Sequence, residues 1–203
     1  MKIPPSRLEA HRGASGACPE NTMLAFAKAR EAGALSIQTD LSLLADGRFA
    51  VFHVSALGRT SAGDASLDSL TSAEIGIRFN LEMKCHGARQ GEAASALAAK
   101  LAGVQPAPNM ISSFDAAFLA TLQTTLPAMP RALISEELPE DWQKLAARLG
   151  LEALHLNKDI LTPGIVEAIP SAGRRVRVWT VNEPADMKRM IDAGVDTVIT
   201  DVP

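Results

Sequence analysis

From residue 79 onward, short apolar runs alternate with segments whose apolar residues recur every three or four positions. The apolar runs are typical of buried strands, and the segments between them are typical of amphipathic helices. Strands that alternate with helices over short connections form a parallel sheet, and the number of units favours a closed (β/α)8 barrel over a doubly wound sheet. The predicted strands are residues 79–84, 110–114, 131–134, 154–157, 176–182 and 197–201, and the predicted helices are residues 93–101, 115–126 and 141–149, one opening at Pro163, and one from Pro184 to Gly194.

The first half of the chain begins in the same way and then changes its pattern. Residues 8–11 read as a short buried strand, and residues 22–32 as a helix. Residues 35–43 alternate apolar and polar positions, as in a strand with one face in water. An Asp-Gly pair at 46–47 then favours a tight turn into a strand at residues 49–53. Because a parallel crossover needs about a dozen residues, we expect these two strands to form an antiparallel hairpin.

The stretch between this hairpin and the second half carries little regular structure. Residues 54–69 are rich in Ser, Gly and Ala and contain Arg59 and Thr60, and residues 70–75 look like a short capped helix. The next strand begins at residue 79. The first half therefore supplies too few helices for a regular barrel.

The composition indicates an ordinary globular chain. Its 203 residues allow one domain with a proper hydrophobic core, and we expect a single domain over residues 1–203. Hydrophobic residues make up 47% and charged residues 21% of the chain, as in soluble proteins. The net charge of −3 provides no overall field for nucleic acid, so an anionic ligand must be met by a local cluster of cations. Cys18 and Cys85 are too few for a disulfide framework.

The ends of the chain and its apolar runs suggest where the protein is located. Residues 1–5 lead directly into the first strand, without the apolar segment of a secretion signal. No apolar run approaches the length of a membrane span. We therefore expect a cytoplasmic protein.

Polar side chains gather at the carboxyl ends of the predicted strands. In a barrel these ends surround one mouth, where such folds place their chemistry. The strand at 79–84 alternates so that Asn80, Glu82 and Lys84 share one face. We expect the following residues to converge at the mouth: His11, Arg12, Gln38, Asp40, His53, Glu82, Lys84, Ser113, Asn157, Trp179 and Asn182.

Together these residues suit the cleavage of a phosphodiester. Asp40 and Glu82 supply the hard oxygen ligands that Mg²⁺ or Ca²⁺ prefers, and the two histidines can act as general base and general acid. Arg12 and Lys84 can hold an anion. Each residue alone has a structural explanation, such as a simple ion pair for Glu82 and Lys84 or a hydrogen-bonded strand position for His53. Their number at strand ends favours the functional explanation.

Short segments spread in order over essentially the whole chain carry a family resemblance. They are His-Arg-Gly at 11–13, Pro-Glu-Asn-Thr at 19–22, Val-Phe-His at 51–53, Leu-Gly-Arg-Thr at 57–60, Leu-Glu-Met-Lys at 81–84, Ile-Ser-Ser-Phe at 111–114, Trp-Thr-Val-Asn at 179–182 and Thr-Asp-Val-Pro at 200–203. Together they resemble the glycerophosphodiester phosphodiesterase family. The resemblance implies a barrel of the phosphatidylinositol-phospholipase-C type, and hydrolysis of glycerophosphodiesters to glycerol 3-phosphate and an alcohol. It also implies attack by the glycerol 2-hydroxyl on phosphorus, through a cyclic intermediate.

Matched motif by motif, the resemblance implies a role for each residue at the mouth. The implied partner is a small-molecule glycerophosphodiester, and the implied cofactor is a divalent cation, Mg²⁺ or Ca²⁺. The three sets are His11 and His53 for proton transfer, Arg12, Lys84 and Trp179 for substrate and phosphate, and Gln38, Asp40 and Glu82 for the metal.

The chain departs from the family pattern at three places. Where the family has Ile-Glu-x-Asp, residues 37–40 read Ile-Gln-Thr-Asp, so Gln38 removes one negative charge and should weaken cation binding. Where the family has His-Asp, this chain has His53-Val54. The family's excursion and following outer helix are missing between residues 75 and 79, and a barrel of this kind typically has about 250 residues. A homodimer would cover the apolar flank left by that loss, unless neighbouring helices shift to close it.

Two functions stay open on the sequence alone. A working phosphodiesterase with weakened metal binding is favoured by the presence of both histidines, both acids and both cations. A catalytically impaired or inactive relative, which binds a phosphorylated ligand or a protein partner, is favoured by the three departures near the site. An unrelated barrel enzyme, such as a phosphate-binding isomerase, would need a Gly-rich phosphate loop late in the barrel, and residues 181–184 do not form one.

Overall fold

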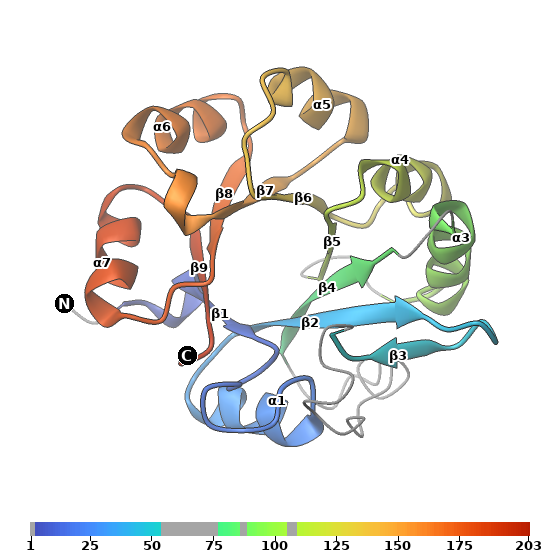
Figure 1. Cartoon of the computed structure of the whole chain (residues 1–203), viewed down its shortest axis with the longest axis horizontal. Coiled ribbons are helices and arrows are strands. Elements are labelled where there is room, and N and C mark those ends of the chain that lie inside the picture. The colour runs from blue at the N-terminus through green and yellow to red at the C-terminus, as the bar shows by residue number, and fades with distance from the viewer. Residues whose placement is uncertain (1–2, 54–76, 86–88, 105–108) are drawn as a thin grey trace.

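Eight parallel strands close into a ring in the computed structural model, which describes residues 3–53, 77–85, 89–104 and 109–203 (Figure 1). The first strand pairs with both the last and the second, which closes the sheet and confirms the predicted barrel. In order around the ring the strands are β1 (Leu8–His11), β9 (Thr197–Thr200), β8 (Arg175–Trp179), β7 (Ala153–Asn157), β6 (Arg131–Ser135), β5 (Met110–Ser113), β4 (Arg78–Lys84) and β2 (Ser36–Leu43).

A ninth strand, β3 (Phe49–Val51), lies outside the ring against β2. The two strands are antiparallel, with Leu41 opposite Val51 and Leu43 opposite Phe49. The predicted hairpin is thus confirmed, although β3 ends two residues before His53. From Val51 the chain continues back alongside β2, away from the end of β2 at Leu43, and reaches His53.

Six α-helices of the described residues surround the ring and connect consecutive strands (Figure 1). Side-chain caps fix several of their first turns: the side chains of Thr22, Asp115 and Thr162 each accept a hydrogen bond from a backbone N–H three residues later. No helix within the described ranges is long and apolar enough to cross a membrane. The helices are α1 (Met23–Glu31), α3 (Gln90–Lys100), α4 (Ala116–Thr125), α5 (Trp142–Leu149), α6 (Pro163–Ser171) and α7 (Pro184–Asp192), with short 3-10 helices η1 (Pro5–Arg7) and η4 (Lys158–Ile160).

The connection from β3 to β4 runs mostly through residues 54–76. The predicted loop at 54–69, the short helix at 70–75 and Val54 lie outside the described residues, as does most of the gap predicted between residues 75 and 79. The described chain resumes at residue 77 and enters β4 at Arg78.

The main apolar core lies between the ring and the helices, where side chains such as Phe26, Leu97 and Phe118 are fully buried. The interior of the ring holds a separate and much smaller apolar cluster of Met110, Ala132 and Ala153. Barrel interiors are usually filled by large branched side chains. In this barrel, polar side chains occupy most of the interior.

An ion pair crosses the interior near the amino ends of the strands. Glu9 of β1 is completely buried, and its Oε2 accepts hydrogen bonds from Arg177 Nη1 at 2.8 Å and Ser36 Oγ at 2.6 Å. Its Oε1 accepts a hydrogen bond from Asn80 Nδ2 at 2.8 Å. A polar cavity of about 70 Å³ opens at the amino-terminal end of the ring. Its lining includes Glu9, Asn80, Arg177 and Arg78.

Removing one partner of this pair is expected to destabilise the barrel strongly. The substitution Glu9→Ala leaves Arg177 charged and uncompensated in the interior, so the free energy of unfolding should fall by about 3–5 kcal/mol. Urea denaturation followed by circular dichroism measures the loss. The double variant Glu9→Leu/Arg177→Met should lose less than Glu9→Ala, because it leaves no buried charge. A double variant that is less stable than Glu9→Ala would contradict the prediction.

Candidate active site

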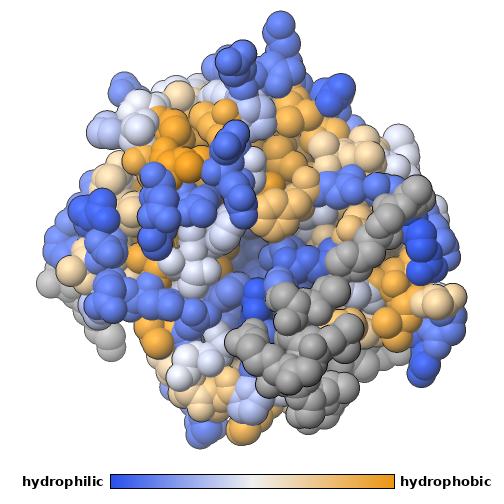
Figure 2. All heavy atoms as spheres, in the orientation of Figure 1, coloured by the Kyte–Doolittle hydropathy of each residue, from blue (hydrophilic) through white to orange (hydrophobic). Residues whose placement is uncertain are grey.

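A cavity of about 260 Å³ opens at the carboxyl ends of the strands. Figure 2 shows this face of the molecule hollowed at its centre, with hydrophilic residues in the hollow. Of the residues given a site role on the sequence, seven line the cavity: His11, Arg12, Gln38, His53, Glu82, Lys84 and Trp179. The eighth, Asp40, is fully buried directly behind this wall.

His11, the last residue of β1, is held by a carboxylate from the opposite end of the sequence. Its Nδ1 lies 2.7 Å from Asp201 Oδ1. Asp201 also accepts hydrogen bonds from Ser15 Oγ at 2.8 Å and from Asn182 Nδ2 at 2.7 Å. Burial alone would raise the pKa of Asp201, but the hydrogen bonds from His11, Asn182 and Ser15 hold that pKa well below its usual range. Because Asp201 is ionised, Nδ1 of His11 carries the proton, and Nε2 is the ring nitrogen left for a ligand.

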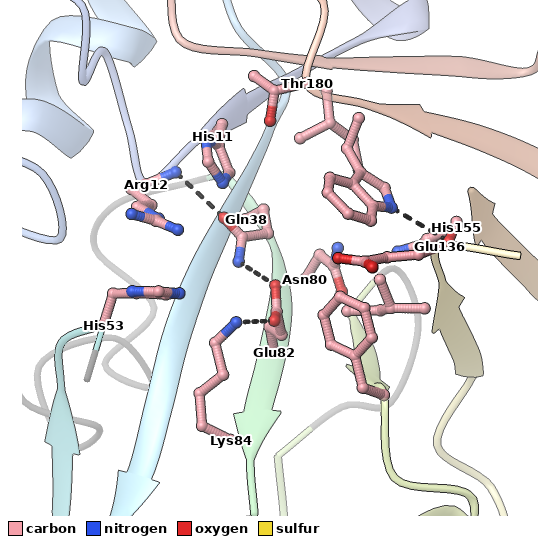
Figure 3. Close-up of a pocket in the computed structure, with 14 residues that line it drawn as sticks. His11, Arg12, Gln38, His53, Asn80, Glu82, Lys84, Glu136, His155 and Thr180 are labelled. Atoms are coloured by element: carbon pink, nitrogen blue, oxygen red, sulfur yellow. Dashed lines mark hydrogen bonds and ion pairs between the residues drawn. The ribbon is translucent and has the colours of Figure 1, made fainter. Parts of the chain in front are cut away.

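His53 approaches the same cavity from the end of the hairpin (Figure 3). Burial, followed by the positive charges of Arg12 and Lys84, lowers its pKa below the ordinary 6.5. The ring is therefore neutral at pH 7 and can accept a proton. The two histidines predicted as a pair thus share one cavity, with Arg12 and Gln38 between them in the close-up view (Figure 3).

Two carboxylates lie side by side on neighbouring strands. Asp40 of β2 is the register partner of Glu82 of β4. The amide Nε2 of Gln38 donates to both, at 3.2 Å from Asp40 Oδ1 and 2.8 Å from Glu82 Oε2. Lys84 Nζ forms an ion pair with each of them, at 3.3 Å from Asp40 Oδ1 and closer to Glu82 Oε1. Burial and the charge of Asp40 raise the pKa of Glu82, so this carboxyl is the one that most needs a positive charge beside it.

The far oxygen of Asp40 is held by the loop that follows β1. Arg12 Nε lies 2.9 Å from Asp40 Oδ2, and Asn21 Nδ2 donates to the same oxygen at 2.9 Å. Glu20 Oε1 accepts a hydrogen bond from Arg12 Nη1 at 3.0 Å. Burial would raise the pKa of Asp40, but Lys84 and Arg12, with the hydrogen bond from Asn21, lower it overall. The loop residues thus keep Asp40 ionised and its orientation fixed.

A glycine lets this loop pass close to the first helix. Gly13 has φ +83°, and a Cβ there would lie only 2.6 Å from the backbone carbon of Ala25. Any other residue would force the backbone away from α1. The His-Arg-Gly segment at 11–13 therefore couples two charged site residues to the turn that positions them.

The carboxylates, with the side chain of Gln38, form a donor set that can hold a hard cation. Both carboxylates contact the same two groups. Gln38 Nε2 donates a hydrogen bond to each of them, and Lys84 Nζ forms an ion pair with each of them. Rotation of the Gln38 amide by half a turn exchanges its NH₂ for its carbonyl oxygen, which is a suitable ligand for Mg²⁺ or Ca²⁺. No cluster of three His, Cys, Asp or Glu side chains suited to a metal occurs among the described residues. The set is therefore two carboxylates and one amide, with one negative charge fewer than three acids would give.

Besides Asp40, three further residues expected at the mouth do not line the cavity, which corrects the sequence prediction. Ser113 Oγ donates to the backbone oxygen of Met83. The side chain of Asn157 caps η4, where it accepts a hydrogen bond from Asp159 N. Asn182 supports Asp201 instead of facing a ligand. Each has a backbone or carboxylate partner nearby that satisfies its short side chain before it can reach the centre.

Conversely, the cavity and its supports include residues that the sequence analysis did not single out. Asp201 follows β9, and its place beside His11 could have been inferred, because closing a barrel puts the last strand next to the first. Glu136 and His155 also line the cavity, from the end of β6 and from β7. His155 lies within an apolar strand, and Glu136 belongs to an acidic pair that follows another strand. Neither sequence context distinguishes a cavity residue from an ordinary strand or loop residue.

Comparison with known proteins supports this description of the fold. The sequence profile of the glycerophosphoryl diester phosphodiesterase family matches residues 11–78 and 77–203. The two matched segments meet at 77–78, where the sequence predicted a missing stretch. The chain is 31% identical to the Bacillus subtilis protein YqiK, over 98% of this chain and 96% of that protein.

Two further relatives have known names that state their activity. A glycerophosphodiester phosphodiesterase of Caldanaerobacter subterraneus subsp. tengcongensis is 30% identical, over 96% of this chain and 93% of the relative. The solved structure of an Oleispira antarctica phosphodiesterase in complex with the product sn-glycerol-3-phosphate superposes with a TM-score of 0.87 at 26% identity, covering 97% of this chain and 93% of that one. The chain therefore belongs to the glycerophosphoryl diester phosphodiesterase family of enzymes.

Proposed function

We propose that this protein hydrolyses glycerophosphodiesters to glycerol 3-phosphate and an alcohol by acid–base catalysis with two histidines and a divalent cation. The observation that carries the proposal is the gathering of two imidazoles, two cationic side chains and two carboxylates around one cavity. The product bound to the Oleispira antarctica relative supports glycerol 3-phosphate as one half of the substrate.

The positively charged side chains of the cavity bind the phosphate in the proposed reaction. Arg12 offers a planar guanidinium and Lys84 a compact ammonium group, and both already face carboxylate oxygens here. Asp40, Glu82 and the carbonyl oxygen of Gln38 are the residues that would hold the cation, either Mg²⁺ or Ca²⁺. A bound divalent cation polarises a phosphoryl oxygen and offsets the negative charge that develops on it.

The two histidines carry out the proton transfers of the proposed reaction. His53 is neutral at pH 7 and takes the proton from the attacking hydroxyl of glycerol. His11 in its protonated form, stabilised through Nδ1 by Asp201, gives a proton from Nε2 to the oxygen of the departing alcohol. The cyclic phosphodiester formed in this step is then opened by water, with the two histidines exchanging roles. Trp179 forms part of the wall against which the substrate lies.

One observation favours a second function, in which the chain binds a phosphorylated ligand without turning it over. Gln38 Nε2 and Lys84 Nζ together satisfy both carboxylates. If a cation cannot displace these donors, it does not bind, and nothing polarises the phosphoryl oxygen. Location in the cytoplasm, a single domain over residues 1–203 and a homodimer remain predictions from the sequence.

Hydrolysis itself is the first test. Wild-type protein with glycerophosphocholine and excess Mg²⁺, Ca²⁺ or Mn²⁺ should release glycerol 3-phosphate, measured by a coupled glycerol-3-phosphate dehydrogenase assay. His11→Ala should lower kcat by about 10²–10⁴-fold, because one proton transfer is lost. No turnover with any of the three cations, in the wild type or in Gln38→Glu, would refute the enzymatic proposal.

Restoring the missing charge should strengthen cation binding. Gln38→Glu is expected to raise the affinity for Ca²⁺ or Mn²⁺ by about tenfold or more, because ligand charge largely sets the affinity for hard cations. Calorimetric titration of the protein with metal alone measures this directly. Gln143→Glu, which adds the same charge on the exposed face of α5, is the matched control. Equal affinities in both variants would place the cation elsewhere.

Asp201 is expected to act as a positioning residue for His11. Asp201→Asn should lower kcat by about 10²–10⁴-fold with little change in KM, because His11 loses its fixed tautomer while the phosphate-binding groups stay in place. Ser15→Ala, which removes only one hydrogen bond to Asp201, should have a much smaller effect. Steady-state kinetics separate kcat from KM. A change confined to KM would argue against a role through His11.

A further inference from the structure

The proposed reaction uses only one side of the cavity. Phosphate, cation and both histidines are all assigned to residues from β1, β2, the hairpin and β4. The opposite side is built from the ends of β5 to β8, and it includes Phe114, Ile134, Glu136, His155 and Trp179. A diester has two alcohol halves, so this side must receive one of them.

Two aromatic rings form an apolar wall on this side. Phe114 and Trp179 meet edge to face, with ring centroids 5.9 Å apart and planes at 81°. The indole Nε1 of Trp179 donates to the backbone oxygen of His155 at 3.2 Å, which fixes the orientation of the ring. Phe114 leaves 48% of its surface exposed, although it is a large aromatic residue. Exposed aromatic faces attract organic cations through their quadrupoles.

Glu136 brings a negative charge to the same side. It follows β6 directly, its side chain is exposed, and Figure 3 shows it reaching into the cavity from the side opposite His53. No lysine, arginine or histidine of the described chain forms an ion pair with it, whereas Asp40 and Glu82 across the cavity both pair with Lys84.

The neighbouring histidine does not supply the missing positive charge. His155 is buried, and burial together with the charge of Arg177 lowers its pKa well below the usual value. The ring is therefore neutral, and its Nε2 has no hydrogen-bond partner within the described structure. Among the described residues, this half of the cavity thus carries two aromatic rings and a carboxylate without an ion-pair partner. The cation that borders it is Lys84 of β4, whose Nζ lies 5.6 Å from the centroid of the Phe114 ring.

We propose that this half of the cavity binds the alcohol of the diester, that the preferred alcohol carries an ammonium group, and that Glu136 is the specificity-determining residue. The inference rests on the proposed function, whose substrate class it narrows. The ammonium group would lie near the Glu136 carboxylate and against the ring of Trp179, where both interactions are attractive, since Lys84 is the cation that lies over Phe114. A neutral alcohol would gain neither.

The experiment compares two diesters that differ in the charge of the alcohol. The values of kcat/KM are measured for glycerophosphocholine and for glycerophosphoglycerol, in the wild type and in Glu136→Gln. The wild type should prefer glycerophosphocholine, and Glu136→Gln should reduce that preference by about five- to tenfold. Glu137→Gln, at the next position and outside the cavity wall, is the matched control and should keep the wild-type ratio.

Two outcomes of the kinetic comparison would overturn the inference. An unchanged ratio in Glu136→Gln would mean that this carboxylate does not sense the alcohol. An equal loss with both diesters would place the glycerol half on this side, with its hydroxyl groups on Glu136. If no variant turns over either diester, calorimetric binding of both to His11→Ala, with and without Glu136→Gln, gives the same comparison. A binding preference that depends on Glu136 would then uphold the inference while the proposed hydrolysis fails.

Discussion

The site depends on one electrostatic constraint: two carboxyl groups on adjacent strands lie side by side in a buried position. Asp40 and Glu82 face each other in register, and both are nearly inaccessible to solvent. Burying one such charge is costly, and burying two together is tolerated only when positive groups and hydrogen-bond donors surround them. Arg12, Lys84 and Gln38 meet that requirement here. The same cluster is the one to which the proposed function assigns the cation and the phosphate.

This constraint explains the arrangement of the loop after β1. The Pro-Glu-Asn-Thr segment is not itself a ligand-binding motif in the structure. Its Glu20 holds Arg12, its Asn21 holds Asp40, and its Thr22 caps the first helix. One short stretch therefore anchors a charged side chain, orients a carboxylate and starts a secondary-structure element. Changes within it would disturb the charge balance of the whole cluster, although none of its side chains lines the cavity.

The sequence was sufficient to predict the barrel, the nine strands and the hairpin, because buried parallel strands and amphipathic helices leave distinct periodicities. It also indicated most of one side of the cavity, since polar residues at strand ends are conspicuous among apolar ones. It could not distinguish Asn157 or Ser113, which bond to nearby backbone, from Glu136, which reaches the cavity. That difference depends on rotamers and on the path of the chain just beyond each strand. Pairing of His11 with Asp201 depends on ring closure, so it follows from the predicted barrel and not from any local pattern.

Asn80 belongs to the walls of both cavities, the one at the carboxyl ends and the smaller one at the amino ends. Within the described ranges, the apolar cluster inside the ring consists of Met110, Ala132 and Ala153, so the apolar layer between the two openings is small. Asn80 thus contacts both cavities, and its Nδ2 donates a hydrogen bond to the Glu9 carboxylate near the amino ends. The two ends of the barrel are consequently not insulated from each other. A change of charge at the amino-terminal opening is therefore expected to act electrostatically on the cavity at the carboxyl ends.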